Sequence, residues 1–298
     1  MRKPVIIGSR RSRLAMAQTE LVISQLQRLF PAQEFVIKPM MTGGDRAADR
    51  FSLGKGIFVK ELEEALLAGT IDAAVHSMKD VPVEPRPGLT IAAMPRRADA
   101  RDAFISFRAT SWKTLSPGSR VGTSSARRGV QLRHCRPDLT IVDIRGNVET
   151  RIAKLHDGGY DAIMLAVAGL ERLGSRALIT QCLPFSVMLP APGQGALGIQ
   201  VRARDRRLLR MARQIDHAAT RCAVEAERAF LAALGGGCNT PAAAYGCLQA
   251  GKLILSGMMA EHDGSGVRRA RLCGAAKSPR VAGRDLFRMV RGYQRGKV

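Results

Sequence analysis

The sequence contains few aromatic and few acidic residues. Aromatic residues make up only 4% of its 298 positions, and 25 Asp and Glu residues stand against 47 Lys and Arg residues, a formal net charge of +22. Such a charge attracts polyanions, but the aromatics are not interleaved with arginines, as a surface that stacks nucleic-acid bases requires. The basic residues indicate instead pockets for small, multiply charged anions, together with a solvated surface. No specific nucleic-acid partner is expected.

Long apolar runs and closely spaced cysteine pairs are also absent. No apolar run reaches the roughly 18 residues that span a bilayer, and the first residues enter a strand-like segment without the apolar core of a signal peptide. The six cysteines form no Cys-x-x-Cys pair and no zinc-like spacing. We therefore expect a cytoplasmic protein with free thiols, no metal site and no membrane partner.

Short apolar strands alternate with amphipathic helices through the first two thirds of the chain. Strands are expected at residues 4–8, 35–41, 71–76, 89–94, 120–122, 140–144, 161–166 and 197–201, and helices at 12–30, 59–67, 124–132 and 148–155. This alternation predicts a mostly parallel, helix-covered sheet in each half. After Ala218, a smaller α+β domain is expected, with helices at 218–234 and 282–294 around antiparallel strands at 243–249, 252–261 and 266–273.

Three strand-to-helix turns, at residues 8–12, 122–128 and 145–151, combine arginines with hydroxyl or amide side chains. Guanidinium groups and the N–H groups of helix N-termini both match carboxylates and phosphates. Any one of these turns is equally typical of a well-capped helix with exposed arginines. Three of them in one α/β chain favour anion binding.

Two side chains with chemical potential lie at the ends of predicted elements. Asp80 follows a buried strand and precedes Pro82, where α/β folds display functional groups, although the position alone fits a turn aspartate that caps local amides. His76 is interpreted as a packed strand-end histidine. Cys238 lies in a glycine-rich loop, and its spacing by itself indicates only an exposed loop cysteine.

Six motifs, taken together and in this order, resemble the porphobilinogen deaminase family. They are GKGIF followed by Lys60-Glu61-Leu62, VHSMKDVP at 75–82, VGTSS with Arg127-Arg128, RGNV at 145–148, residues 190–198, and LGGGC at 234–238. The resemblance implies two α/β domains like those of periplasmic solute-binding proteins around a cleft, at 1–95 with 196–214 and at 101–190. It places hinges near 96–101 and 190–195, and a cofactor-carrying α+β domain at 218–298.

The resemblance also implies a reaction. A hydroxymethylbilane synthase is a transferase that joins four porphobilinogen molecules head to tail on a covalent dipyrromethane, with loss of ammonia, before water releases the linear tetrapyrrole of haem-type biosynthesis. Cys238 matches the cysteine that holds the dipyrromethane through a thioether. Asp80 matches the catalytic aspartate, whose carboxylate would stabilise the cation formed as ammonia departs. The family resemblance suggests a monomer.

The remaining site residues implied by the resemblance are basic or polar, as the acetate and propionate of each pyrrole require. The cofactor would be bound by Ser77, Lys79, Thr123, Ser125, Arg127, Arg128, Arg145 and Asn147, and the substrate by Arg10, Ser12, Gln18, Lys55, Arg145, Arg151 and Arg172. The chain departs from the family pattern at Arg13, Ala126 and Gln200, which replace proline, leucine and glutamate. Segment 45–55, which resembles a mobile lid, is shorter than usual, so its behaviour and the role of Lys55 are open.

Three other interpretations compete with this one. A solute-binding protein shares the two-domain cleft, but it would be exported and would have no use for Cys238. A nucleic-acid binder would explain the net charge but neither Asp80 nor Cys238, and its binding to random DNA would fall steeply with salt. An inactive family member is disfavoured because Asp80, Cys238 and the arginines are all present.

Overall fold

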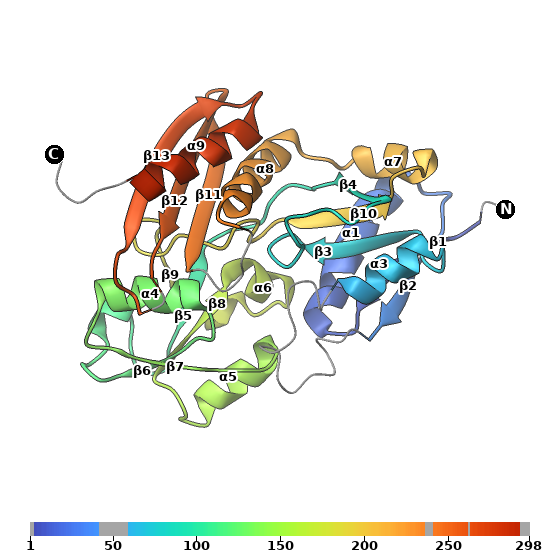
Figure 1. The fold of residues 1–298 in the computed structure, drawn as a ribbon. Helices are drawn as coiled ribbons and strands as arrows, with labels where there is room; N and C mark the ends of the chain where they lie inside the picture. Colours follow the sequence, from blue (N-terminus) through green and yellow to red (C-terminus); the bar gives the residue numbers. More distant parts are fainter. Residues whose placement is uncertain (1–2, 42–58, 236–240, 262, 293–298) are drawn as a thin grey trace. The chain divides into compact units, whose positions relative to one another are not determined.

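The computed structural model describes residues 3–41, 59–235, 241–261 and 263–292. These residues form two compact units (Figure 1). The first unit lies within residues 1–97 and 196–221, and the second within 98–195 and 222–298. Each unit is described by itself. Within the described ranges, no helix is long and apolar enough to cross a membrane.

The first unit contains a five-stranded sheet in the order β2-β1-β3-β10-β4. Its strands are β1 (Val5–Arg10), β2 (Phe35–Met40), β3 (Ala73–Ser77), β4 (Leu89–Ala93) and β10 (Leu197–Arg202). Strand β1 pairs in parallel with β2 and β3, whereas β10 pairs antiparallel with β3 and β4.

Helices cover both faces of this sheet. They are α1 (Arg13–Leu29), α3 (Lys60–Leu67) and α7 (Arg206–Arg213). Because successive strand residues point to opposite faces, Ala73 and Val75 of β3 join one core with α1 and α7, while Ala74 joins a second core with α3. The sheet is therefore buried on both sides and its strand ends carry the polar groups.

The second unit repeats this sheet order as β7-β6-β8-β5-β9. Its strands are β5 (Asp102–Ile105), β6 (Arg120–Gly122), β7 (Thr140–Val142), β8 (Ala162–Ala166) and β9 (Gln181–Cys182), and its helices are α4 (Ala126–Cys135), α5 (Val148–His156) and α6 (Val167–Arg172). Short 3₁₀ turns lie at Trp112–Thr114 and Arg176–Leu178. The identical order in both units confirms the predicted pair of α/β domains.

The prediction of mostly parallel sheets holds for the direction of the strands, since four of the five in each sheet run the same way, but one reversed strand makes each sheet mixed. In each sheet, two strand pairings are parallel and two are antiparallel. The cause is the fourth strand in the order. Strand β10 joins the first sheet only after the chain has returned from the second unit, and β5 is the first strand after the chain has left the first unit. Both therefore run opposite to the strands beside them.

A third, antiparallel sheet completes the second unit. Strands β11 (Ala242–Gln249), β12 (Lys252–Met259) and β13 (Arg268–Ala275) pair in that order, and α8 (Ala218–Ala233) and α9 (Pro279–Gly292) lie along one face (Figure 1). Phe230 of α8 and Leu286 of α9 pack with Leu253 and Leu255 of β12 in one core. This confirms the predicted α+β fold with a three-stranded sheet, while the predicted division at residues 101–190 and 218–298 stays a prediction.

Two buried contacts join the third sheet to the rest of its unit. Val130 of α4 and Leu189 share a core with Ala243 and Met258 of the third sheet. Glu227 of α8 is fully buried, and its carboxylate accepts hydrogen bonds from the N–H groups of Gly193 and Gly246 at 2.7 and 2.8 Å. The second unit is therefore continuous through its interior.

Helix α9 approaches α8 so closely that Gly283 has no room for a side chain. A Cβ at Gly283 would lie 2.2 Å from the carbonyl oxygen of Ala226 and 2.7 Å from Cβ of Ala229. We expect Gly283→Ala to lower the free energy of unfolding by about 1–3 kcal/mol through overpacking, although alanine favours helix. Urea denaturation measures the change. In Gly292→Ala on the same helix, where no described atom lies within 4 Å, the shift should stay below about 0.5 kcal/mol; equal losses in both variants would contradict the packing argument.

Candidate functional site

In the first unit, the predicted site residues gather where β1 and β3 end. These strands are parallel neighbours, with Ile7 opposite Ala73 and Gly8 opposite Ala74, so their carboxyl ends meet at one edge of the sheet. Arg10 ends β1 there and Ser77 ends β3. The cluster at this edge, called here the first-unit cluster, comprises Arg10, Ser12, Gln18, Ser77, Lys79 and Asp80.

A backbone hydrogen bond and the buried side chain of Met78 fix the turn that carries Asp80. The Asp80 N–H donates to the carbonyl oxygen of Ser77 at 2.9 Å, and Met78 between them is buried. A Cβ at Gly198 of β10 would come within 2.2 Å of the Met78 sulfur, so the glycine makes the space that Met78 fills. Packing therefore holds the turn while Lys79 and Asp80 stay exposed.

Two polar side chains near the start of α1, Ser12 and Gln18, differ in their access to solvent. Ser12 caps α1 by accepting a hydrogen bond from the Ala15 N–H at 3.3 Å, and Gln18 one turn later is buried at 7% exposure. A long polar side chain at a buried position of α1 needs a polar partner. Gln18 is thus, with Thr19, one of the buried polar side chains of α1.

His76 on β3 belongs to a buried polar chain. Its Nε2 lies 2.8 Å from Oε1 of Gln200, and Nε2 of Gln200 donates to Oε1 of Glu63 at 2.9 Å. Because the amide oxygen accepts, the Nε2–H of the imidazole donates. Burial lowers the pKa of His76 to about 4, with Arg10 acting in the same direction and the Gln200 hydrogen bond opposing it. His76 is a packed strand-end histidine, as interpreted from the sequence, and it is neutral at pH 7.

In the second unit, the predicted residues follow the carboxyl ends of β6, β7 and β8, which are neighbouring parallel strands. This second-unit cluster comprises Thr123, Ser125, Arg127, Arg128, Arg145, Asn147, Arg151 and Arg172. Ser125 caps α4 by accepting from the Arg128 N–H, and Asn147 caps α5 by accepting from the Thr150 N–H at 2.8 Å. The Thr123 hydroxyl oxygen accepts from the Ser125 N–H at 3.2 Å. The helix caps expected at these turns are present, but Arg127 and Arg128 are buried rather than exposed, so the interpretation as capped helices with exposed arginines holds only in part.

The turn before α5 requires a glycine. Gly146 has a φ of +119°, and a Cβ there would lie 2.7 Å from Cβ of Thr150. Its carbonyl oxygen accepts from Nε of Arg151 at 2.9 Å, so the turn aligns that arginine with the start of the helix. Arg145 is half exposed, and its Nε donates to the Asp143 carboxylate at 2.8 Å.

The adjacent arginines 127 and 128 face inward. Their side chains are 7% and 8% exposed, and both contact Asp102, which is fully buried on β5. Nη1 of Arg127 donates to Oδ2 of Asp102 at 2.7 Å and to the carbonyl oxygen of Leu189 at 2.6 Å. Arg128 donates to Oδ1 through Nε and Nη2 and to the Met164 carbonyl oxygen through Nη1. All three side-chain nitrogens of Arg128 thus donate hydrogen bonds. Arg127 donates to the described residues only through Nη1.

Asp102, which the sequence analysis did not single out, is the residue that holds Arg127 and Arg128 in place. Burial alone would raise the pKa of its carboxyl, but Arg127 and Arg128 hold that pKa well below its usual range, and Gln194 donates a further hydrogen bond at 3.0 Å. The sequence feature that could have pointed to a buried charge is this aspartate directly before the apolar Ala103-Phe104-Ile105. A charge in such a run requires a buried partner.

Arg172, at the end of α6, is half-buried. Its Nη2 donates to the carbonyl oxygen of Gly195 at 2.6 Å, and burial lowers its pKa to about 10. Gly195 has a φ of +84°, and a Cβ there would lie 2.7 Å from the carbonyl oxygen of Ala98. Lys55, Cys238 and the 45–55 segment lie outside the described residues. Within the described part of the chain, no group of three or more His, Cys, Asp or Glu side chains is arranged to hold a metal ion.

Two family models match the chain, one after the other. The model for porphobilinogen deaminase, dipyromethane cofactor binding domain, matches residues 5–210, and that for porphobilinogen deaminase, C-terminal domain, matches residues 221–290. The chain belongs to the porphobilinogen deaminase family. Membership in the porphobilinogen deaminases confirms three predictions: the chain is a transferase, it acts in tetrapyrrole biosynthesis as a hydroxymethylbilane synthase, and its cofactor is a dipyrromethane.

Curated proteins named porphobilinogen deaminase are similar along nearly their whole length. The protein of Roseiflexus castenholzii is 47% identical over 289 residues, covering 96% of this chain and 95% of the relative. That of Moorella thermoacetica is 44% identical over 295 residues, covering 98% and 94%. Similar solved structures include a putative methionine-binding lipoprotein of Bacillus subtilis (12% identity, TM-score 0.46, covering 72% of this chain and 90% of that one) and a periplasmic substrate-binding protein of an ABC transporter from Coxiella burnetii (15%, 0.46, 71% and 91%).

The buried histidine predicts a pH dependence of stability. In the unfolded chain His76 takes up a proton near pH 6.5, and in the folded protein near pH 4. Between these values the unfolded state binds more protons, so the free energy of unfolding falls as the pH is lowered, by on the order of 3 kcal/mol for this group. Urea denaturation between pH 4 and 7 measures the slope. We expect His76→Gln to have a smaller slope, and a variant with the wild-type slope would show that His76 does not cause it.

Proposed function

We propose that both clusters serve hydroxymethylbilane synthesis, with Asp80 as the catalytic residue and the basic side chains as carboxylate ligands. The observation that carries the proposal is the exposed Asp80 carboxylate, held on a packed turn at an edge that also bears Arg10 and Lys79. A carboxylate in that position can stabilise positive charge on a pyrrole as ammonia leaves and can accept or return a proton.

The donor groups of the clusters match the chemistry of a dipyrromethane. Guanidinium, ammonium, hydroxyl and amide N–H groups are the donors that acetate and propionate side chains require. When bound, the dipyrromethane supplies the pyrrole position to which substrate units are joined. We assign its carboxylates to Ser77, Lys79, Thr123, Ser125, Arg127, Arg128, Arg145 and Asn147. The substrate carboxylates are assigned to Arg10, Ser12, Gln18, Lys55, Arg145, Arg151 and Arg172.

The two adjacent arginines have different parts in this proposal. Arg128 uses one N–H of each of Nε, Nη1 and Nη2 within the protein, so it positions the start of α4 and has only the second N–H of Nη1 and of Nη2 for a cofactor carboxylate. Arg127 is fixed through Nη1, which leaves its Nε and Nη2 groups for a carboxylate oxygen. Because Asp102 aligns both guanidinium groups before any ligand arrives, little side-chain entropy remains to be lost on binding.

We further propose that Cys238 forms the thioether to the dipyrromethane and that the protein acts as a monomer in the cytoplasm. The thiolate is the nucleophile that such a bond needs. The five cysteines that the structure describes are all free, which fits a reducing compartment. The predicted three-domain division, with the third domain at 218–298, places Cys238 on the cofactor-carrying domain.

The intact mass of the purified protein tests the proposed anchor. Wild-type protein should exceed its sequence mass by one dipyrromethane, and Cys238→Ser should show the sequence mass alone. Cys247→Ser is the matched control and should keep the mass excess. A mass excess that survives in Cys238→Ser would move the attachment to another residue, and a wild type that stays unmodified after incubation with hydroxymethylbilane would contradict the cofactor assignment.

The role of Asp80 is tested by Asp80→Asn, which keeps the size of the side chain and removes its charge. Because the side chain is exposed, the variant should fold and retain the dipyrromethane mass, whereas kcat should fall by about a hundredfold or more. Porphobilinogen consumption is measured beside Asp157→Asn, an exposed aspartate outside both clusters. Turnover within a few-fold of wild type in Asp80→Asn would remove Asp80 from the mechanism.

A further inference from the structure

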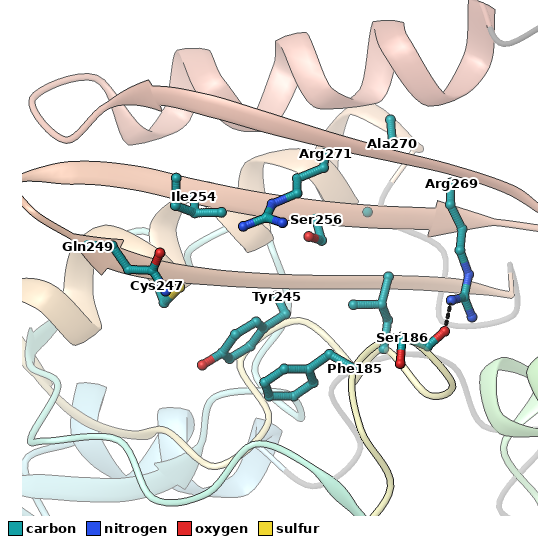
Figure 2. Close-up of a pocket in the computed structure, with 12 residues that line it drawn as sticks. Phe185, Ser186, Tyr245, Cys247, Gln249, Ile254, Ser256, Arg269, Ala270 and Arg271 are labelled. Atoms are coloured by element: carbon teal, nitrogen blue, oxygen red, sulfur yellow. Dashed lines mark hydrogen bonds between the residues drawn. The ribbon is translucent and has the colours of Figure 1, made fainter. Parts of the chain in front are cut away.

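A groove of about 600 Å³ lies on the face of the third sheet that α8 and α9 do not cover (Figure 2). Residues of β11, β12, β13 and the 185–189 segment line it. The volume falls in the range of small-molecule sites. None of the lining residues belongs to the first-unit or second-unit cluster, although the carbonyl oxygen of Leu189 in the lining accepts a hydrogen bond from Arg127.

The strand register arranges the groove from an aromatic side to a cationic side. Tyr245 of β11, Ser256 of β12 and Arg271 of β13 are direct cross-strand partners and so lie in one row on the same face. Adjacent strands are about 4.8 Å apart, which puts the two ends of the row roughly 10 Å from each other. Figure 2 shows the Arg271 side chain reaching across β12 toward the β11 side.

A stacked aromatic pair forms the first side. The rings of Phe185 and Tyr245 have centroids 3.9 Å apart and an interplanar angle of 25°. Stacking restricts both rings and presents a preformed apolar wall. Ile254 of β12 adds aliphatic surface beside it. This side of the groove suits a flat, unsaturated ring system.

Arg269 lines the groove, and its guanidinium group is bound to other residues of the protein. It donates hydrogen bonds to the carbonyl oxygens of Ser186 and Val187 and, at 3.0 Å, to Oε1 of Gln131. Burial lowers its pKa. These contacts tie the 185–187 segment to β13 and keep Phe185 in place against Tyr245.

Arg271 is the cation that these contacts leave available. It is exposed, and no described residue forms a hydrogen bond or an ion pair with it. Among the lining residues described, none is Asp or Glu. A guanidinium group with no acidic neighbour at the rim of an apolar groove is complementary to an anion attached to an apolar body.

We propose that this groove binds a small aromatic carboxylate, whose ring system packs on the Phe185–Tyr245 pair and whose carboxylate pairs with Arg271. Ser256, midway along the row, offers a hydroxyl to the same anion. A two-ring aromatic carboxylate is long enough to reach from the stacked pair to the guanidinium group. The site takes this ligand class independently of the reaction assigned to the clusters.

Two matched ligands and two matched variants test the proposal. Naphthalene-2-carboxylate and the neutral 2-naphthalenemethanol share the ring system and differ in the anion, and ligand-observed NMR titration gives the Kd of each. Wild-type holoenzyme should bind the carboxylate about tenfold or more tightly than the alcohol, the range expected for a charge-assisted hydrogen bond. Arg271→Gln should abolish this preference and leave binding of the alcohol unchanged.

Arg284→Gln is the control for net charge. Arg284 is exposed on α9, which covers the opposite face of the same sheet, so this variant should keep the full preference for the carboxylate. Porphobilinogen turnover of Arg271→Gln should equal that of wild type, which separates this proposal from the proposed function. The proposal is overturned if wild type binds both ligands equally or neither, if Arg271→Gln keeps the preference, or if Arg284→Gln loses it to the same extent.

Discussion

The architecture of the second unit depends on one buried carboxylate, that of Asp102. It receives hydrogen bonds from Arg127 and Arg128 of α4 and from Gln194, far along the chain. A buried ion pair is weak evidence for stability because desolvation offsets the attraction, but loss of one partner leaves charge buried and unpaired. The main structural effect of Asp102 is therefore to align the side chains of Arg127 and Arg128. It sets the direction of α4, and with it the caps and arginines that follow β6.

The same order of strands in both five-stranded sheets gives each unit the same kind of edge. Three parallel strands end side by side, and the loops that follow them carry polar side chains whose backbones are fixed by helix caps. Helix N-termini contribute N–H groups and a favourable dipole for anions. Each edge thus offers N–H groups and basic side chains of the kind that the proposed carboxylate ligands require.

Much of the fold was predictable from local patterns, and the parts that were not depend on distant contacts. The regular apolar spacing of α1 and the short apolar runs of β1 and β3 were sufficient to predict them. Strand β5 was missed because it has four residues and begins with a charge, and α7 because its arginines outnumber its buried Leu208 and Ala212. The motifs led to Asp80 directly. The inward orientation of Arg127 and Arg128 could not be predicted, since their partner lies on another element and the sequence does not show the pairing.

The two interior links of the third sheet, through Glu227 and through the core around Val130 and Met258, have a consequence for cooperativity. Elements that share buried contacts open together rather than separately. The third sheet is consequently no detachable module: a chain cut before α8 would expose Val130 and Leu189 to water and leave the Gly193 N–H without its carboxylate acceptor. The second unit is therefore expected to unfold as one cooperative unit, although it contains two sheets.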